Sequence, residues 1–282
     1  HMEWRGRRGS RNVEDRRGTG ARAGGMGIVG VLAVLAVGYF FNIDISPLMG
    51  ALDQGGQTTE SRELTAQEQE MGQFVSVVLA DNEDVWNRVL PEQMGVDYRE
   101  PSLVMFSGVV NSACGTAQSA MGPFYCPNDQ KIYLDTDFFR TMSQRMGAGG
   151  DFAYAYVIAH EVGHHVQNLL GILEQSMKAR QRSDEAQANR ISVLTELQAD
   201  CFAGIWARQA NEQFGSLEPG DVEEAIGAAE AVGDDTLMAN AGRAVVPDAF
   251  THGSSEQRME WFQRGFKTGQ LGQCDTFKAA GM

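Results

Sequence analysis

The chain has 282 residues and 43% hydrophobic residues, enough for one large domain or two small ones with a substantial core. Its formal net charge of −14 is unevenly distributed, because residues 1–25 carry seven Arg against three acidic residues and the remainder is strongly acidic. An acidic body argues against a nucleic-acid partner.

The N-terminal part divides into a basic head and an apolar segment. Residues 1–25 are rich in Arg and Gly without hydrophobic periodicity, which predicts a disordered head. Residues 26–41 carry no charge, and their length lies between a signal-peptide core and a full membrane span. Because the arginines precede this segment, we interpret residues 26–45 as a transmembrane signal anchor whose N-terminal side is cytoplasmic.

This interpretation makes the chain a single-pass protein of the inner (plasma) membrane, with its folded domain on the periplasmic or extracellular side. A cleaved signal peptide is one alternative, disfavoured because no clear A-x-A site follows the segment. A buried helix of a globular domain is the other. Residues 46–63 have the composition of a linker.

Residues 64–282 are predicted to form one helix-rich α+β domain with a small sheet. Thr65 to Glu68 is a capping-box signature before a helix that runs to about Leu90. Alternating residues predict strands over 102–110 and 131–135, followed by a short helix over 137–146. Further helical patterns cover the segment before Gly171 and residues 185–213, 219–232 and 254–266.

The helical segment before Gly171 contains an H-E-x-x-H motif, His160-Glu161-Val-Gly-His164. His160 and His164 are four residues apart, so both imidazoles project from one face of a helix. Glu161 is then placed to reach a water held by a metal on that face. This arrangement is typical of zinc-dependent hydrolysis with a carboxylate base. The alternative is a buried helix whose histidines satisfy only local hydrogen bonds.

Two carboxylates on the next long helical pattern supply what this motif lacks. Two histidines leave a catalytic zinc one protein ligand short of the usual three. Glu196 and Asp200 are four residues apart in an otherwise apolar stretch, where unpaired carboxylates are costly. We therefore expect Glu196 to be the third zinc ligand and Asp200 to accept the free ring N–H of a ligand histidine. The alternative is a solvated acidic stripe on a surface helix.

Four cysteines lie beyond the expected anchor, and an even number there suits disulfides. Three pairings are possible. Cys114 and Cys126 bracket a short Gly-containing loop between strands, which favours that pair and, by elimination, Cys201 with Cys274. Free buried thiols are the alternative if the domain is cytosolic.

The sequence resembles a known family at this point. H-E-x-x-H followed by E-x-x-x-D is the gluzincin pattern of zinc peptidases. Residues 159–167, Glu196 to Cys201 and Thr251 to Arg258 resemble the bacterial "putative neutral zinc metallopeptidase" family, and the resemblance runs from about Met105 to Cys274. It implies a zincin-like fold and hydrolysis of peptide bonds.

The resemblance also implies roles for two further segments. Thr251 to Arg258 is similar to a gluzincin segment whose histidine stabilises the oxyanion, which assigns that role to His252, although Gly253 stands where a proline is usual. Tyr125 and Tyr133 are rival oxyanion donors. By the same resemblance, Asn111, Ser112 and Ala113 are the candidate edge strand for an extended substrate.

The predicted function is hydrolysis of a peptide or protein substrate with Zn²⁺ as cofactor, held by His160, His164 and Glu196 and with Glu161 as general base. A non-catalytic zinc scaffold at the membrane is one alternative, against which the intact Glu161 argues. A zinc amidase or deformylase that acts on a non-protein substrate is the other, and it would use the same chemistry.

Overall fold

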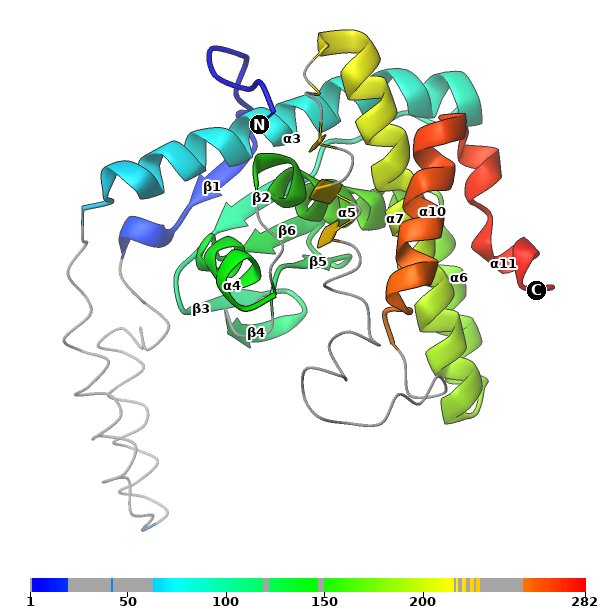
Figure 1. The fold of residues 1–282 in the computed structure, drawn as a ribbon. Coiled ribbons are helices and arrows are strands. Elements are labelled where there is room, and N and C mark those ends of the chain that lie inside the picture. Colours follow the sequence, from blue (N-terminus) through cyan, green and yellow to red (C-terminus); the bar gives the residue numbers. More distant parts are fainter. Residues whose placement is uncertain are drawn as a thin grey trace.

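A computed structural model of the chain describes residues 2–19, 42, 63–118, 122–146, 150–215, 217, 220–221, 224–225, 227–228 and 251–282. It confirms the α+β class with a small sheet and many helices. In Figure 1 the sheet lies to one side of α5, while α6, α7, α10 and α11 lie on the other. The helices are α3 (Ala66–Met94), α4 (Asp137–Met146), α5 (Asp151–Leu169), α6 (Ile172–Gln181), α7 (Glu185–Phe214), α10 (Ser255–Thr268) and α11 (Thr276–Ala279), with short 3-10 turns at Arg17–Thr19 and Leu271–Cys274.

The main sheet has four strands in the order β1-β2-β6-β5. The strands β1, β2 and β6 are parallel, and β5 is antiparallel to β6. A separate antiparallel pair is formed by β3 and β4. The bounds are β1 (Val13–Asp15), β2 (Ser102–Met105), β3 (Val109–Ser112), β4 (Gly115–Gln118), β5 (Phe124–Cys126) and β6 (Lys131–Leu134).

Most helix boundaries follow the local rules that predicted them. Thr65 and Glu68 form the expected capping box at the start of α3. The expected single strand over 102–110 is instead two strands, β2 and β3. They are separated by a turn at Gly108, whose φ of 81° suits glycine and whose N–H donates to Asp135.

The helix α6 was not predicted from the sequence. Gly171, with a φ of 78°, follows the end of α5, and a new helix begins one residue later. The helix expected over 219–232 falls mostly on residues outside the described part of the chain.

Residues 2–19 are an ordered part of the domain, so the prediction of a disordered head over 1–25 is wrong for them. Met2 and Trp4 are buried in the main core, and β1 pairs with β2 in the sheet. Arg7 donates to Asp81 at 2.8 Å, and Arg8 pairs with Glu83 at 3.3 Å. The arginines therefore order this arm because acidic side chains of α3, remote in sequence, pair with them.

Residues 26–41 and 43–62 lie outside the described part of the chain, so the expected anchor over 26–45 and linker over 46–63 cannot be placed. Among the helices that are described, none combines the length and the apolarity needed to cross a bilayer. The pairing of β1 with β2 does bear on topology. It brings residues 13–15 and 102–105, on either side of the expected anchor, into one sheet.

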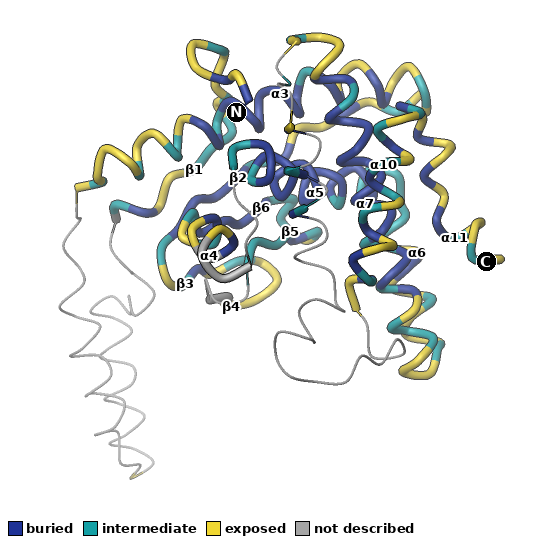
Figure 2. Tube along the Cα trace, viewed as in Figure 1, coloured by how far each residue is buried: buried dark blue, intermediate teal, exposed yellow. Residues whose placement is uncertain are grey.

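Both predicted disulfides are confirmed. Cys114–Cys126 joins the turn between β3 and β4 to β5, and Cys201–Cys274 joins α7 to the 3-10 turn that precedes α11. The larger core cluster lies among α3, α5, α7 and the inner face of the sheet, and the tube of Figure 2 is dark along most of α5 and the middle of α7. The site described next is built on these two buried helices.

Candidate active site

The helices α5 and α7 touch at a glycine inside the H-E-x-x-H motif. A Cβ added to Gly163 would lie 2.9 Å from the carbonyl oxygen of Ala199, which is closer than real Cβ contacts allow. Ala199 stands between Glu196 and Asp200 on α7. The close approach at Gly163 therefore brings both carboxylates against the histidine face of α5.

Three side-chain atoms converge where the sequence predicts a zinc site. The Nε2 atoms of His160 and His164 lie 2.8 and 3.1 Å from Oε2 of Glu196, and the ligand atoms of the three residues lie within 4.8 Å of one another. Two tetrahedral zinc ligands at about 2.0–2.1 Å from the ion would be roughly 3.3 Å apart. The two N–O distances are close to this value, and the donor set N, N, O is one that zinc uses.

In both histidines Nδ1 has a hydrogen-bond partner, whereas Nε2 faces Glu196 at the candidate metal position. Nδ1 of His160 lies 2.7 Å from Oδ1 of Asp200, and Nδ1 of His164 lies 2.8 Å from Oε1 of Gln167. Both partners accept hydrogen bonds through oxygen, so each histidine would keep its proton on Nδ1 when a metal ion takes Nε2. The ring tautomers thus fit a metal ion, and the expected contact between Asp200 and a ligand histidine is present.

The charges of the cluster are strongly coupled. Burial acts to raise the pKa of Glu196, but the two histidines outweigh it and hold that pKa well below its usual range. Burial acts in the opposite direction on His160, where Asp200 and Glu196 prevail and raise the pKa to about 10. Without a metal ion, the cluster is therefore an imidazolium held by carboxylates. A divalent cation satisfies the same carboxylates.

Glu161 lies beside the ligand cluster on α5 and is buried. Burial raises its pKa above the ordinary value of a glutamate. A carboxylate whose affinity for a proton is increased in this way is suited to accept one and to release it again.

Asp200 is the centre of a buried network that the sequence only partly predicted. Its Oδ1 accepts from Tyr156 and lies near His160, while its Oδ2 accepts from Nε of Arg258 at 2.7 Å. Arg258 also donates to Tyr156 at 3.2 Å. Tyr156 was missed, although its place four residues before His160 puts both on one helix face. Arg258 belongs to the segment that resembles gluzincins, and here it supports Asp200.

The remaining predicted residues are distributed differently. His252 is exposed on the loop before α10, where its Nδ1 lies 2.9 Å from Oγ1 of Thr251. Gly253 has a φ of 96°, which a proline cannot adopt, so this loop departs from the gluzincin segment it resembles. The oxyanion role of His252 stays a prediction.

The two tyrosines named as rival oxyanion donors are engaged elsewhere. The hydroxyl of Tyr125 lies 2.6 Å from Nδ1 of His165 and accepts from Asn168, and that of Tyr133 donates to Asp129. His165 donates through Nε2 to the carbonyl of Arg99, and burial lowers its pKa to about 4. His165 is therefore a neutral structural residue, and it does not belong to the candidate ligand cluster.

The candidate edge strand of residues 111–113 lies outside the main sheet, and its role in substrate binding stays a prediction. Asn111 and Ser112 belong to β3, and Ala113 to the turn after it, in a two-stranded sheet of their own. Within the described residues, the outer strands of the main sheet are β1 and β5, and β5 also contacts α5. The turn at Gly108 directs the chain out of the main sheet before residue 111 is reached.

The comparisons with known proteins agree with the donor set. The chain matches the family described as "Putative neutral zinc metallopeptidase" over residues 2–277. It is 47% identical to YpfJ of Escherichia coli strain K12, over 98% of this chain and 99% of that protein. It is 44% identical to Rv2575 of Mycobacterium tuberculosis strain H37Rv, over 70% of this chain and 67% of that protein. No solved structure matches. The chain therefore belongs to the "Putative neutral zinc metallopeptidase" family.

Proposed function

We propose that this protein is a zinc-dependent peptidase whose metal is held by His160, His164 and Glu196. The observation that carries the proposal is the convergence of their three ligand atoms within 4.8 Å, with Nδ1 of each histidine already in contact with another partner. Family membership supports the same class of chemistry.

The residues of the chain divide the work of hydrolysis among them. Zinc bound at this position supplies Lewis acidity and lowers the pKa of a coordinated water toward about 7. Glu161 accepts a proton from the attacking water and delivers it to the leaving amine. Asp200 holds the ring of His160, and Arg258 holds Asp200, so that the ligand geometry is kept throughout the reaction. In this proposal His252 donates to the oxyanion.

In this proposal, an extended peptide substrate pairs with the edge of the main sheet that β5 forms. The strand β5 is paired with β6 on one side only, within the described residues, and it contacts α5. A peptide that pairs with the backbone of Phe124, Tyr125 and Cys126 would be recognised mainly through its main chain. The hydroxyl of Tyr125, bonded to Asn168 of α5, fixes this strand against the helix that carries the motif.

We also propose that the domain works outside the cytoplasm, attached to a membrane through residues 26–45. The two disulfides support an oxidising compartment. Since residues 2–19 are part of the same folded domain, they share that compartment.

The proposal is tested on purified full-length protein with a zinc assay and a peptide-library digest. We expect one zinc per chain and cleavage of peptides by the unmodified protein. The Glu161→Gln variant should keep its zinc and lose cleavage, by about 10²-fold or more, since the general base is gone. Glu174→Gln, at an exposed position of α6, is the matched control and should behave as the unmodified protein.

Three outcomes would contradict the proposal. Protein without zinc, or Glu196→Ala that retains full zinc affinity, would exclude the ligand set. Zinc-loaded protein that never cleaves peptides would favour a scaffold. Cleavage confined to amides other than peptides would favour a zinc amidase.

A further inference from the structure

We propose that Gln167 and Gln198 are positioning residues of the metal site, which hold the ring of His164 through a directional chain of hydrogen bonds that ends at the backbone carbonyl of Cys274. This inference rests on the proposed zinc site. It concerns His164, whereas Asp200 contacts the other histidine, His160. The support that it assigns to His164 is made of neutral amides.

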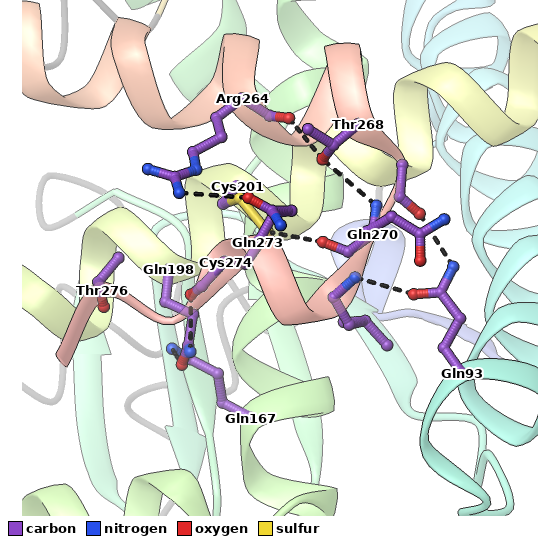
Figure 3. Close-up of a disulfide and its surroundings, with 12 residues drawn as sticks. Gln93, Gln167, Gln198, Cys201, Arg264, Thr268, Gln270, Gln273, Cys274 and Thr276 are labelled. Carbon is purple, nitrogen blue, oxygen red and sulfur yellow. Dashed lines mark hydrogen bonds between the residues drawn. A yellow bond between two sulfur atoms is a disulfide. The ribbon is translucent and has the colours of Figure 1, made fainter. Parts of the chain in front are cut away.

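The contacts form an unbroken series. Nδ1 of His164 lies 2.8 Å from Oε1 of Gln167. Nε2 of Gln167 donates to Oε1 of Gln198 at 2.8 Å, and Nε2 of Gln198 donates to the carbonyl of Cys274 at 3.0 Å. Figure 3 shows Gln167, Gln198 and Cys274 in succession beside the disulfide.

The direction of this chain follows from its fixed end. A backbone carbonyl only accepts, so the amide of Gln198 must turn its NH₂ toward Cys274 and its oxygen toward Gln167. Gln167 must then turn its NH₂ toward Gln198, and it donates to a second fixed acceptor, the carbonyl of Thr195, at 2.9 Å. Its oxygen is left to face His164. Nδ1 of His164 must therefore carry the ring proton, and Nε2 presents its lone pair to the metal.

Burial makes an alternative arrangement costly. Gln167 is fully buried and Gln198 is 5% exposed, so water cannot replace a broken bond in the chain at little cost. An amide of Gln167 in the opposite orientation would set its NH₂ against Nδ1 of His164 and move the ring proton to Nε2. The metal would then lose this ligand.

The disulfide holds the fixed end in place. Cys274 is bonded to Cys201, which lies on α7 three residues after Gln198, so the carbonyl and the glutamine that binds it are tied to one helix. Thr276 adds a second tie by donating to the carbonyl of Leu194 on the same helix, at 2.7 Å. The Cys201–Cys274 disulfide is not part of the proposed ligand set. Because it holds the end of the hydrogen-bond chain, we expect it to influence the affinity of the site for zinc.

The test measures zinc affinity of the full-length protein by competition with a chelator. Gln167→Met keeps the side-chain volume and removes the hydrogen bonds, and it should weaken zinc binding by between about tenfold and a hundredfold. Gln198→Met should weaken it in the same direction by less. Gln209→Met is the matched control, because Gln209 is also a buried glutamine of α7, whose partner is Arg88, and zinc affinity should not change.

A second comparison separates positioning from packing. Gln167→Glu keeps an oxygen acceptor for His164 but buries a charge, whereas Gln167→Met keeps the site neutral. If the role of Gln167 is to accept from His164, the glutamate variant binds zinc more tightly than the methionine variant. If Gln167 serves only packing, the methionine variant should bind zinc more tightly than the glutamate variant and should also have the higher unfolding midpoint.

The disulfide is tested with its own control. Replacing Cys201 and Cys274 together by Ala should lower zinc affinity and alter the visible spectrum of the cobalt-substituted protein, while replacing Cys114 and Cys126 should change neither. If the unmodified protein binds no zinc, the proposed function fails. If it binds zinc and Gln167→Met binds equally well, within about twofold, the positioning role is wrong although the zinc site stands.

Discussion

Oδ1 of Asp200 lies 2.7 Å from Nδ1 of His160, and both side chains are buried. The opposite oxygen of the same carboxylate accepts from Arg258 at 2.7 Å, so one anion joins a proposed metal ligand on α5 to a cation on α10. Burial acts to raise the pKa of Asp200, but Arg258 and then His160 outweigh it and lower the pKa to about 2. The carboxylate is therefore charged at neutral pH and in mild acid.

Removing that charge should destabilise the protein strongly. In Asp200→Asn the guanidinium of Arg258 stays buried without a counter-ion, and we expect the free energy of unfolding to fall by about 3–5 kcal/mol. Arg258→Met should cost a similar amount. Combined, the two substitutions should cost less than the sum of the single losses, by about 0.5–3 kcal/mol, because they remove interacting partners. Urea unfolding measures all three. Arg264→Gln, at an exposed position of the same helix, is the control, and strict additivity would contradict the network.

A second prediction concerns Asp81, which is buried on α3 opposite Arg7. Burial raises its pKa to about 6, above the value of 3.8 expected in the unfolded chain. The folded state therefore binds the proton more tightly, and this contribution to stability is present below pH 4 and is lost as the pH rises through 6. At neutral pH the charged form costs about 2–3 kcal/mol.

The Asp81→Asn variant removes this dependence. Relative to the unmodified protein, its free energy of unfolding should improve by about 2–3 kcal/mol between pH 4 and pH 7. The comparison uses the change between the two pH values, so any constant effect of the amide cancels. Asp84→Asn, which alters a more exposed carboxylate on the same helix, is the matched control. A difference between variant and unmodified protein that stays constant from pH 4 to pH 7 would show that Asp81 titrates normally.

The parts of the site that the sequence could predict are those governed by local rules. The i, i+4 spacing within α5 and within α7 is a property of each helix alone, and it was sufficient to select His160, His164, Glu196 and Asp200. The capping residues Thr65 and Ser254 follow equally local rules.

The parts that it could not predict depend on tertiary packing. Gln167 accepts from His164 only because Gln198 and Thr195 of another helix orient its amide. Tyr156 has the right helical spacing, but an aromatic residue on an apolar face is indistinguishable from core packing until Asp200 is placed beside it. The division of the strands into two sheets could not be predicted for the same reason, since strand order is not a local property.

The N-terminal arm, residues 2–19, is the clearest case of a feature that depends on tertiary packing. Its arginines were interpreted through the rule that places positive charge on the cytoplasmic side, a rule that treats the segment in isolation. Asp81 and Glu83, some seventy residues later, are what turn those arginines into a folded element. The family match from residue 2 onward is consistent with an arm that belongs to the domain.

The arm should therefore contribute to stability through its apolar residues. The ring of Trp4 is buried and meets Phe74 edge-on, with 5.4 Å between the ring centroids. Trp4→Ala should lower the free energy of unfolding by about 3–5 kcal/mol, as for other buried tryptophans. Arg11→Ala, at an exposed position of the same arm, should change it by less than about 0.5 kcal/mol. If Trp4→Ala unfolds at the same urea concentration as the unmodified protein, the arm is not docked in solution.

The last prediction concerns membrane topology. The expected single-pass anchor would put residues 2–19 and the domain on opposite sides of a membrane, yet β1 and β2 are hydrogen-bonded neighbours with Val13 opposite Leu103. A strand cannot pair through a bilayer, so both ends of the expected anchor must lie on one side. We therefore expect Arg11→Cys in the arm and Gln213→Cys in the domain, both exposed, to react alike with a membrane-impermeant maleimide in intact cells. Permeabilised cells provide the control for reactivity. Labelling of Gln213→Cys with protection of Arg11→Cys would restore the single-pass anchor and would mean that β1 leaves the sheet in the cell.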